Sequence, residues 1–172
     1  MTASNEAYSA IEKLDASHEV DAFDCGKEPL DLFLKRYALV NLKAGSAQTY
    51  VVCGEGRRVA GYYSLTYGAV EHSDAAARVS KGLARHPIPV MLLARLAIDK
   101  REQGRGLGRA LLKDALRRTS QAADIAGMRA LLVHAKDDEA RAWYEALNFE
   151  SSPTDPYHLF LLLKDLRALL GA

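Results

Sequence analysis

The sequence REQGRGLGRALL, residues 101–112, places three glycines at alternate positions just before a run with helical spacing. Glycine is costly inside regular structure, so Gly104, Gly106 and Gly108 indicate a backbone that turns tightly or closely approaches a ligand. The preceding run VMLLARLAID (90–99) is almost continuously apolar, which predicts a strand covered on both faces. The stripe of the following helix, which runs toward residue 126, consists of Leu107, Ala110, Leu111 and Ala115.

A strand that turns through glycines into a helix presents free backbone N–H groups at the positive end of the helix dipole, an arrangement that binds phosphate. Gln103, Arg105 and Arg109 add side-chain donors. No Lys-Ser or Lys-Thr follows the glycines, which excludes a Walker A loop. Arg109 stands where the dinucleotide fingerprint requires its third glycine. The expected ligand is therefore neither a nucleoside triphosphate nor NAD.

Length and composition predict one compact domain over residues 1–172, since 49% of the residues are apolar and 26% are charged. No apolar run is long enough to span a bilayer, so we expect a cytoplasmic protein. Two distant cysteines and five scattered histidines predict neither a disulfide framework nor a metal site. The segment from Arg78 to Arg118 contains eleven Lys or Arg residues and three Asp or Glu residues. Its net positive charge suits either a polyanionic ligand or a solvated basic surface.

The remaining elements follow from periodicity and turn signals. Residues 9–14 suit a short strand, and the segment from Pro29 to Leu42 has the stripe of an amphipathic helix, formed by Leu30, Phe33, Leu34, Tyr37 and Ala38. We expect strands at 49–53, 59–70, 130–135 and 157–164, and helices at 137–149 and 164–170. Residues 73–86 suit a short helix or loop. This order indicates an α+β sheet domain.

The spacing Gln103-x-x-Gly106-x-Gly108 after the strand LARLAID resembles the pyrophosphate motif of the GNAT acetyltransferase superfamily. The resemblance is strengthened by the later W-Y-x-x-x-x-F at Trp143, Tyr144 and Phe149, and it spans about residues 7–164. The alternative is an ordinary glycine-rich turn. The resemblance implies the GNAT fold: a central mixed, mostly antiparallel sheet with splayed middle strands, flanked by helices.

The resemblance also implies acetyl-coenzyme A as the donor. Its diphosphate would be held by the loop residues Gln103, Gly104, Arg105, Gly106, Leu107, Gly108 and Arg109. Its pantetheine arm would pair with the backbone of Leu96, Ala97 and Ile98, near which an N–H would stabilise the oxyanion.

By the same resemblance, Tyr144 would give a proton to the departing thiolate, with an ordinary phenol pKa of roughly 10. The alternative is that Tyr144 is simply a core residue. His134 and Glu139 are candidate bases, although a histidine inside an apolar strand is expected to be packed. No base is needed for an α-amine, which is partly neutral at cellular pH, and this favours α-amines over lysine side chains.

The sequence resembles one branch of the superfamily more closely than the others. The pattern FDCG-x-x-x-LD-x-FL, which coenzyme A binding does not demand, is met by Phe23, Asp24, Cys25, Gly26, Leu30, Asp31, Phe33 and Leu34. It resembles the GNAT toxins of bacterial type II toxin–antitoxin modules, although a helix entry turn plus a core stripe would also explain it.

That branch implies acetylation of the α-amine of aminoacyl-tRNA, inhibition of translation and a ribbon-helix-helix antitoxin. Arg78, Lys81, Arg85 and Arg95 are the candidate tRNA contacts, because tRNA affinity comes largely from phosphate contacts. The alternatives are an acetyltransferase for a protein N-terminus or a small amine such as a polyamine, and a binding module without catalysis. The terminal segment DLRALLGA (165–172) suits a homodimer or antitoxin contact as well as a cap on the protein's own core.

Overall fold

The computed structural model describes residues 8–171, so both ends of the expected domain, residues 1–7 and Ala172, lie outside it. The seven strands have the order β1-β2-β3-β4-β5-β7-β6. Strands β4 and β5 pair in parallel, whereas the pairs β1–β2, β2–β3, β5–β7 and β6–β7 are antiparallel. The sheet is therefore mixed and mostly antiparallel, which confirms the α+β fold class. The chain forms two compact units, which are described separately below.

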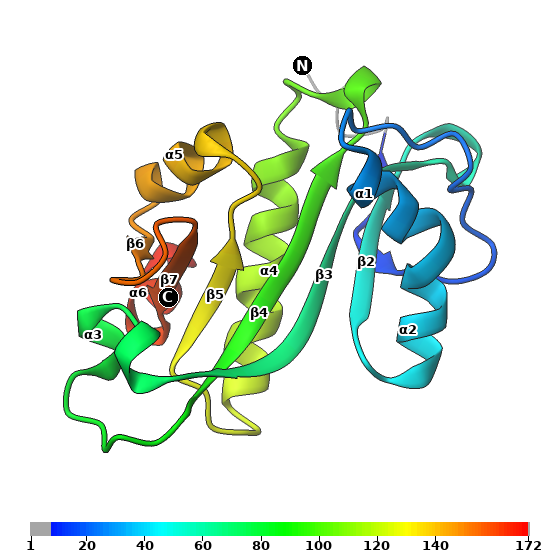
Figure 1. The fold of residues 1–172 in the computed structure, drawn as a ribbon. Helices are drawn as coiled ribbons and strands as arrows, with labels where there is room; N and C mark the ends of the chain where they lie inside the picture. Colours follow the sequence, from blue (N-terminus) through cyan, green and yellow to red (C-terminus); the bar gives the residue numbers. More distant parts are fainter. Residues whose placement is uncertain (1–7, 172) are drawn as a thin grey trace. The chain divides into compact units, whose positions relative to one another are not determined.

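The first unit contains the residues up to Leu65 together with Arg95–Ala115. Figure 1 shows its helix α2 beside strand β2. Its elements are β1 (Glu12–Lys13), α1 (Glu28–Leu32), a π-helical turn (Phe33–Tyr37), α2 (Ala38–Ala44), β2 (Gln48–Cys53), a 3₁₀ turn (Glu55–Arg57), the start of β3 (Val59–Val70), the end of β4 (Ile88–Ile98), a 3₁₀ turn (Lys100–Glu102) and the start of α4 (Leu107–Ala123).

The helical segment from Glu28 to Ala44 confirms the predicted amphipathic helix, but its middle is a π-helical turn. The N–H of Ala38 bonds to the carbonyl of Phe33, five residues back instead of four. The extra residue rotates the stripe: Phe33, Leu34 and Ala38 are buried, whereas Tyr37 is 50% exposed. Placing Tyr37 on the buried stripe was therefore wrong, because a uniform period of 3.6 residues does not hold across this turn.

Gly61 of β3 lies where the chain comes too close for any side chain. A Cβ built on it would be 2.7 Å from Cδ1 of Ile98 and 2.9 Å from Cδ1 of Leu111, and 3.3 Å from the carbonyl oxygen of residue 97. Because Leu111 is fully buried, its methyl group cannot retreat without disturbing the core. The glycine thus allows β3 to lie close to the end of β4 and the start of α4.

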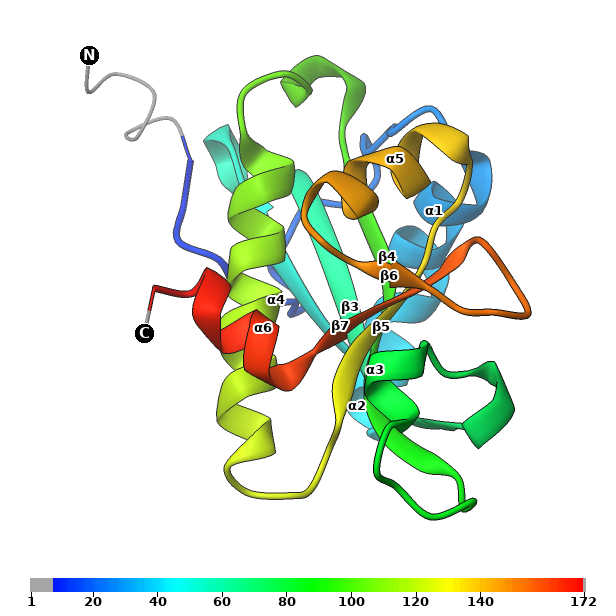
Figure 2. The same ribbon diagram turned by 90° about the vertical axis from the view of Figure 1, so that its left-hand side faces the viewer.

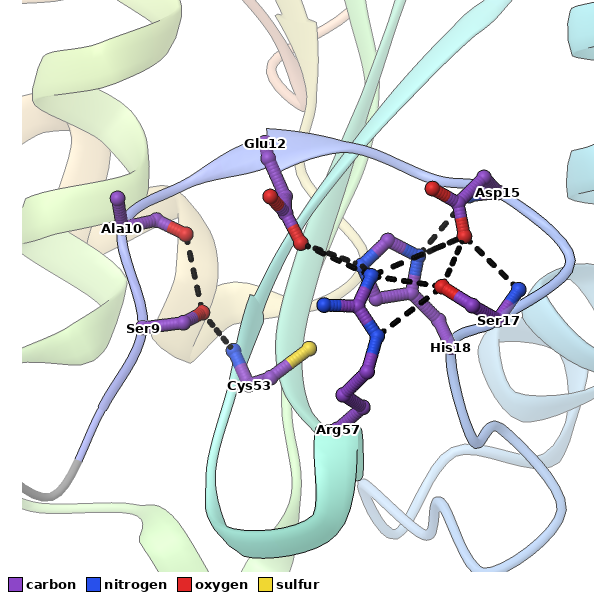
Figure 3. Close-up of polar contacts among 8 residues, drawn as sticks. All are labelled: Ser9, Ala10, Glu12, Asp15, Ser17, His18, Cys53 and Arg57. Carbon is purple, nitrogen blue, oxygen red and sulfur yellow. Dashed lines mark hydrogen bonds and ion pairs between the residues drawn. The ribbon is translucent and has the colours of Figure 1, made fainter.

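The N-terminal segment is fastened by a buried histidine, which the sequence did not single out (Figure 3). The side chain of His18 is fully buried. Its Nδ1 accepts the N–H of Asp15 at 2.9 Å, and its Nε2 donates to Glu12 Oε1 at 2.8 Å. Arg57, on the hairpin between β2 and β3, bonds to the same Glu12 oxygen at 3.3 Å and also to Ser17. These contacts hold β1 and the following turn against the hairpin.

The second unit contains Thr66–Ala94 together with the residues from Leu116 on. Figure 2 shows α6 leaving the end of β7 in this unit. Its elements are the end of β3, a 3₁₀ turn (His72–Asp74), α3 (Ala77–Ser80), most of β4, the end of α4, β5 (Ala130–His134), α5 (Asp138–Ala146), β6 (Glu150–Ser151), β7 (His158–Leu162) and α6 (Leu163–Leu169). A buried cluster of α3, β4, β5 and β7 residues forms its core, including Val79, Ile88, Leu132 and Phe160.

Two expectations about the strands need correction. Strand β6 was not predicted, because two polar residues carry no alternating pattern. Strand β4 was expected to be covered on both faces, but only Ile88, Val90, Leu93 and Ala97 among its residues are buried. The apolar residues between them are half-exposed, which leaves part of a central strand open. No helix within residues 8–171 is both long and apolar enough to cross a bilayer.

Candidate functional site

The glycine loop has the conformation that its sequence predicts. Gly104 and Gly106 have φ angles of +81° and +83°, which residues with a side chain rarely adopt, and a Cβ on either would meet no atom within 4 Å. Helix α4 begins at Leu107, and its first internal bond runs from the N–H of Ala110 to the carbonyl of Gly106. The N–H groups of residues 107–109 therefore precede the helical ladder, at the positive end of the helix dipole. The loop residues 103–106 are exposed.

The end of β4 leads directly into this loop in Figure 1. Gln103 closes the loop on the strand, because its side-chain amide donates to the carbonyl of Ile98 at 3.0 Å and to that of Cys25 at 3.4 Å. These donors are thus used within the protein and not toward a ligand. Ala97 is buried, whereas Leu96 and Ile98 are half-exposed.

The FDCG turn, residues 23–26, is bound to the residues that introduce the loop. The N–H of Asp24 donates to Asp99 Oδ2 at 3.2 Å, and the N–H of Lys100 donates to the carbonyl of Asp24 at 2.8 Å. Lys100 Nζ also lies 3.1 Å from Asp24 Oδ2. This motif was taken as independent of donor binding, yet it supports the base of the glycine loop. The link was invisible in the sequence because about 75 residues separate the partners.

Asp99 is the buried carboxylate at this junction. Its oxygens accept the N–H of Asp24, the N–H of Arg101 and the guanidinium of Arg101 at 2.9–3.2 Å. Burial raises the pKa of Asp99, but the hydrogen bonds from Arg101 and Asp24 outweigh burial and hold that pKa at about 2. The carboxylate is therefore ionised in the folded protein, where it fixes the start of the loop.

Replacing Asp99 with asparagine should lower the free energy of unfolding at pH 7 by about 2 kcal/mol. Above the ordinary pKa of 3.8 the carboxylate contributes its full stability, and this contribution is lost as the pH falls toward 2. The gap between wild type and Asp99→Asn should therefore close from about pH 4 downward. Urea unfolding at pH 7, 4 and 3 measures it, with the exposed Asp21→Asn as control. A gap that stays constant with pH would contradict this account.

Glu102 joins the N-terminal segment to the loop. This carboxylate is 7% exposed, and it accepts Tyr8 Oη at 2.5 Å, Arg58 Nη2 at 2.9 Å and Arg105 Nη1 at 3.1 Å. The hydrogen bond from Tyr8 lowers the pKa of Glu102. Arg105 is thus held in place, whereas Arg109 is exposed on the first turn of α4. A cavity of about 600 Å³ opens here, lined by Tyr8, Ser9, Gly54, Glu55, Arg58, Glu102 and Arg105.

Tyr144 lies in α5 with its ring buried. The ring makes edge contacts with Trp143 and Phe149, whose centroids are 5.0 and 5.2 Å away. Asp137 caps the helix by accepting the N–H of Ala140 at 2.8 Å. Within residues 8–171 no hydrogen bond is made by the Tyr144 hydroxyl. Burial raises the pKa of Tyr144 well above its ordinary value, so the assumed value of roughly 10 was too low. The hydroxyl stays protonated and is free to donate.

His134 is the exposed last residue of β5, which corrects the expectation that it is packed. Its ring stacks on that of His158, the opposing residue of β7, with 4.0 Å between centroids. Asp155 Oδ2 lies 3.4 Å from His158 Nε2. Partial desolvation of its ring and the neighbouring His158 lower the pKa of His134. Neither His158 nor Asp155 was singled out in the sequence, because only the antiparallel register brings them to His134.

These side chains line a pocket of about 500 Å³ in the second unit. Part of its lining is apolar, formed by Val90, Leu92, Leu132 and Phe160. Its other lining residues are Gly68, Ala69, Val70, Glu71, Asp74, His134, Thr154, Asp155 and His158.

The candidate tRNA contacts have different surroundings. The Arg78 guanidinium is bound by Asp165 at 2.5 Å and Glu150 at 2.9 Å, whereas Lys81 and Arg85 are exposed. Arg95 lies in the first unit with its guanidinium carbon 3.6 Å from the centre of the Phe33 ring. Arg78 and Arg95 therefore already have partners within the described residues.

Comparison with known proteins gives a family match and similar chains. The acetyltransferase (GNAT) domain family matches residues 46–151. The tRNA-acetylating toxin of Mycobacterium tuberculosis is 51% identical over 164 residues, which cover 95% of this chain and 98% of that protein.

Two solved structures are similar over nearly the whole chain. AtaT complexed with acetyl-methionyl-tRNAfMet has a TM-score of 0.85 at 30% identity, covering 93% of this chain and 98% of that one. A tyrosine-to-phenylalanine variant of AtaT, bound to the C-terminus of the antitoxin AtaR and acetyl-CoA, has a TM-score of 0.82 at 29% identity. It covers 96% of this chain and 99% of that one.

Proposed function

Because the chain belongs to the GNAT acetyltransferase family, we propose that it is an acetyl-CoA-dependent toxin that acetylates the α-amino group of aminoacyl-tRNA and so inhibits translation. The observation that carries the proposal is the 51% identity to a tRNA-acetylating toxin along almost the full length of both chains. The AtaT complex with acetyl-methionyl-tRNAfMet supports the same substrate class. One acetyltransferase domain then occupies residues 1–172.

The donor binds at the glycine loop. The backbone amides of residues 103–109 bind the diphosphate, and the oriented guanidinium of Arg105 and the exposed one of Arg109 add positive charge. Leu96, Ala97 and Ile98 offer backbone groups to the amides of the pantetheine arm. Backbone pairing of β4 with β5 ends at Leu93–Val133. The residues of β4 beyond Leu93 are therefore not paired with β5, which supports this role for the end of β4. Asp99 and the FDCG turn hold the loop in position.

Acetyl transfer needs an electrophile, a neutral amine and a proton donor. Acetyl-CoA supplies an acetyl group on a thioester. A backbone N–H near Leu96 to Ile98 stabilises the negative charge that develops on the acetyl oxygen. Tyr144 donates its proton to the departing sulfur, and its unpartnered hydroxyl within the described residues supports this role. The rise in its pKa makes it a weak acid but keeps it protonated at every physiological pH.

Binding of tRNA rests on positive charge. Lys81 and Arg85 are exposed and contact the acceptor-stem phosphates, while Arg78 and Arg95 contribute by exchanging or sharing their present partners. The protein works in the cytoplasm, where charged tRNA is found. A ribbon-helix-helix antitoxin neutralises it, a role supported by the structures of AtaT with AtaR. In the terminal segment 165–172, Leu169 is 45% exposed and is available for that contact or for a homodimer.

Incubation of the purified protein with labelled acetyl-CoA and total charged tRNA tests the proposal. We expect label on the amino group of the aminoacyl ester, and mass spectrometry of the released ester identifies the amino acid. Deacylated tRNA serves as the control and should stay unlabelled. Label on protein N-termini or polyamines instead would support the other acceptors, and acetyl-CoA binding without any transfer would indicate a binding module.

A further inference from the structure

We propose that Tyr8 is a positioning residue of the donor site, because its hydroxyl and Glu102 together hold the guanidinium of Arg105 ready for the diphosphate of acetyl-CoA. This inference rests on the proposed function and adds to it a residue of the N-terminal segment. The three residues all belong to the first unit, which also contains the glycine loop. The N-terminal segment is thereby part of the donor site, although 94 positions separate Tyr8 from Glu102.

The hydroxyl of Tyr8 lies between a carboxylate and a guanidinium. It donates to Glu102 Oε2 at 2.5 Å and accepts Arg105 Nη1 at 3.1 Å, and that nitrogen is also 3.1 Å from Glu102 Oε2. The other carboxylate oxygen, Oε1, accepts Arg58 Nη2 at 2.9 Å. Because both oxygens of Glu102 are already engaged, the carboxylate does not bind Arg105 as a two-pronged fork.

Most of the Arg105 guanidinium is therefore left for a ligand. Within residues 8–171 its contacts with Tyr8 and Glu102 are made through Nη1. A guanidinium has five N–H donors in one plane, so Nε and Nη2 keep donors that can reach phosphate oxygens. The side chain is 58% exposed, and its backbone lies between the two loop glycines with positive φ angles. The partly satisfied guanidinium thus stands in the loop that we assign to the diphosphate.

The cavity beside Arg105 shows why this side chain needs a fixed position. The cavity has a volume of about 600 Å³, and Tyr8, Glu102 and Arg105 are among its lining residues. A long arginine side chain loses much conformational freedom when a ligand fixes it. Without the Tyr8 hydroxyl, the guanidinium could turn into the cavity or close on Glu102 Oε2. Both positions compete with diphosphate binding, so fixing Arg105 in advance raises donor affinity.

The backbone next to Tyr8 is tied to the end of strand β2. The N–H of Ser9 donates to the carbonyl of Cys53 at 2.8 Å, and the N–H of Cys53 donates to Ser9 Oγ at 3.0 Å (Figure 3). Cys53 is buried, so this attachment point belongs to the packed part of the first unit. The sheet therefore delivers the Tyr8 side chain to the loop.

The test is a double-mutant cycle on acetyl-CoA affinity, measured by isothermal titration. Tyr8→Phe should raise Kd about fivefold, because it removes one hydroxyl and keeps the ring. Arg105→Ala should raise Kd about tenfold. The double variant should bind no more weakly than Arg105→Ala, because the hydroxyl acts through that guanidinium. Tyr37→Phe is the control and should match wild type, since Tyr37 is 50% exposed and its hydroxyl has no hydrogen-bond partner within residues 8–171.

A merely structural role for Tyr8 would weaken binding by the same factor with or without Arg105, so the double variant would lose about 50-fold. That result would overturn the proposal, as would an unchanged Kd for either single variant. Urea unfolding of every variant checks that each one is folded at the temperature of titration. If wild type itself does not bind acetyl-CoA, the proposed donor site fails as a whole, whereas tight binding by both wild type and Tyr8→Phe removes only the role of Tyr8.

Discussion

Replacing Tyr144 with phenylalanine should reduce acetyl transfer at least about 100-fold while leaving acetyl-CoA affinity and stability unchanged. Phenylalanine keeps the ring contacts with Trp143 and Phe149 and removes only the hydroxyl. Because that hydroxyl has no hydrogen-bond partner among residues 8–171, its loss exposes no unsatisfied group there. The loss should therefore appear in kcat and not in folding.

Tyr67→Phe is the matched control, because it removes a hydroxyl that donates to the carbonyl of Gly127 at 2.6 Å. It should cost about 1 kcal/mol of stability and leave acetyl transfer unchanged. Thermal unfolding and initial rates on both variants separate the two effects. Full activity of Tyr144→Phe would remove the proton-donor role and leave Tyr144 as a core residue.

Replacing Gly106 with alanine should weaken acetyl-CoA binding at least about tenfold. A residue with a Cβ resists the positive φ of +83° by about 1–2 kcal/mol, so the loop relaxes and its amides no longer converge. Gly45 offers a control at the end of α2, with a φ of +76° and equally open surroundings. Gly45→Ala carries the same backbone strain in a different place.

Both glycine variants should lose a similar amount of stability, but only Gly106→Ala should lose affinity. Isothermal titration with acetyl-CoA and urea unfolding measure the two quantities on the same samples. Unchanged affinity in Gly106→Ala, or an equal loss in Gly45→Ala, would show that the loop amides are not the diphosphate site.

Local patterns predicted the elements that carry the proposed donor site. The stripe from Leu107 predicted α4, and the run 59–70 predicted β3 with the bounds that the structure has. Periodicity and turn chemistry are short-range properties, so they can be recognised in a single sequence. The positive φ angles of Gly104 and Gly106 were likewise indicated by the local sequence.

Contacts between distant residues were not predictable in this way. Asp24 meets Asp99, and Tyr8 meets Glu102 across 94 positions, because the tertiary fold and not a local repeat brings them together. The His134–His158 pair depends on the register of β5 and β7, and a slip of one residue would separate the rings. The π-helical turn was not predicted for a different reason, because it breaks the period on which helix prediction relies.

The close approach at Gly61 constrains how related chains diverge. The hydrogen atom of this glycine occupies the space between the methyl groups of Ile98 and Leu111. A lineage that acquires alanine at position 61 is therefore expected to acquire smaller residues at both position 98 and position 111. In descendants of this chain, residues 61, 98 and 111 should therefore change together, although they lie at least 13 positions apart in the sequence.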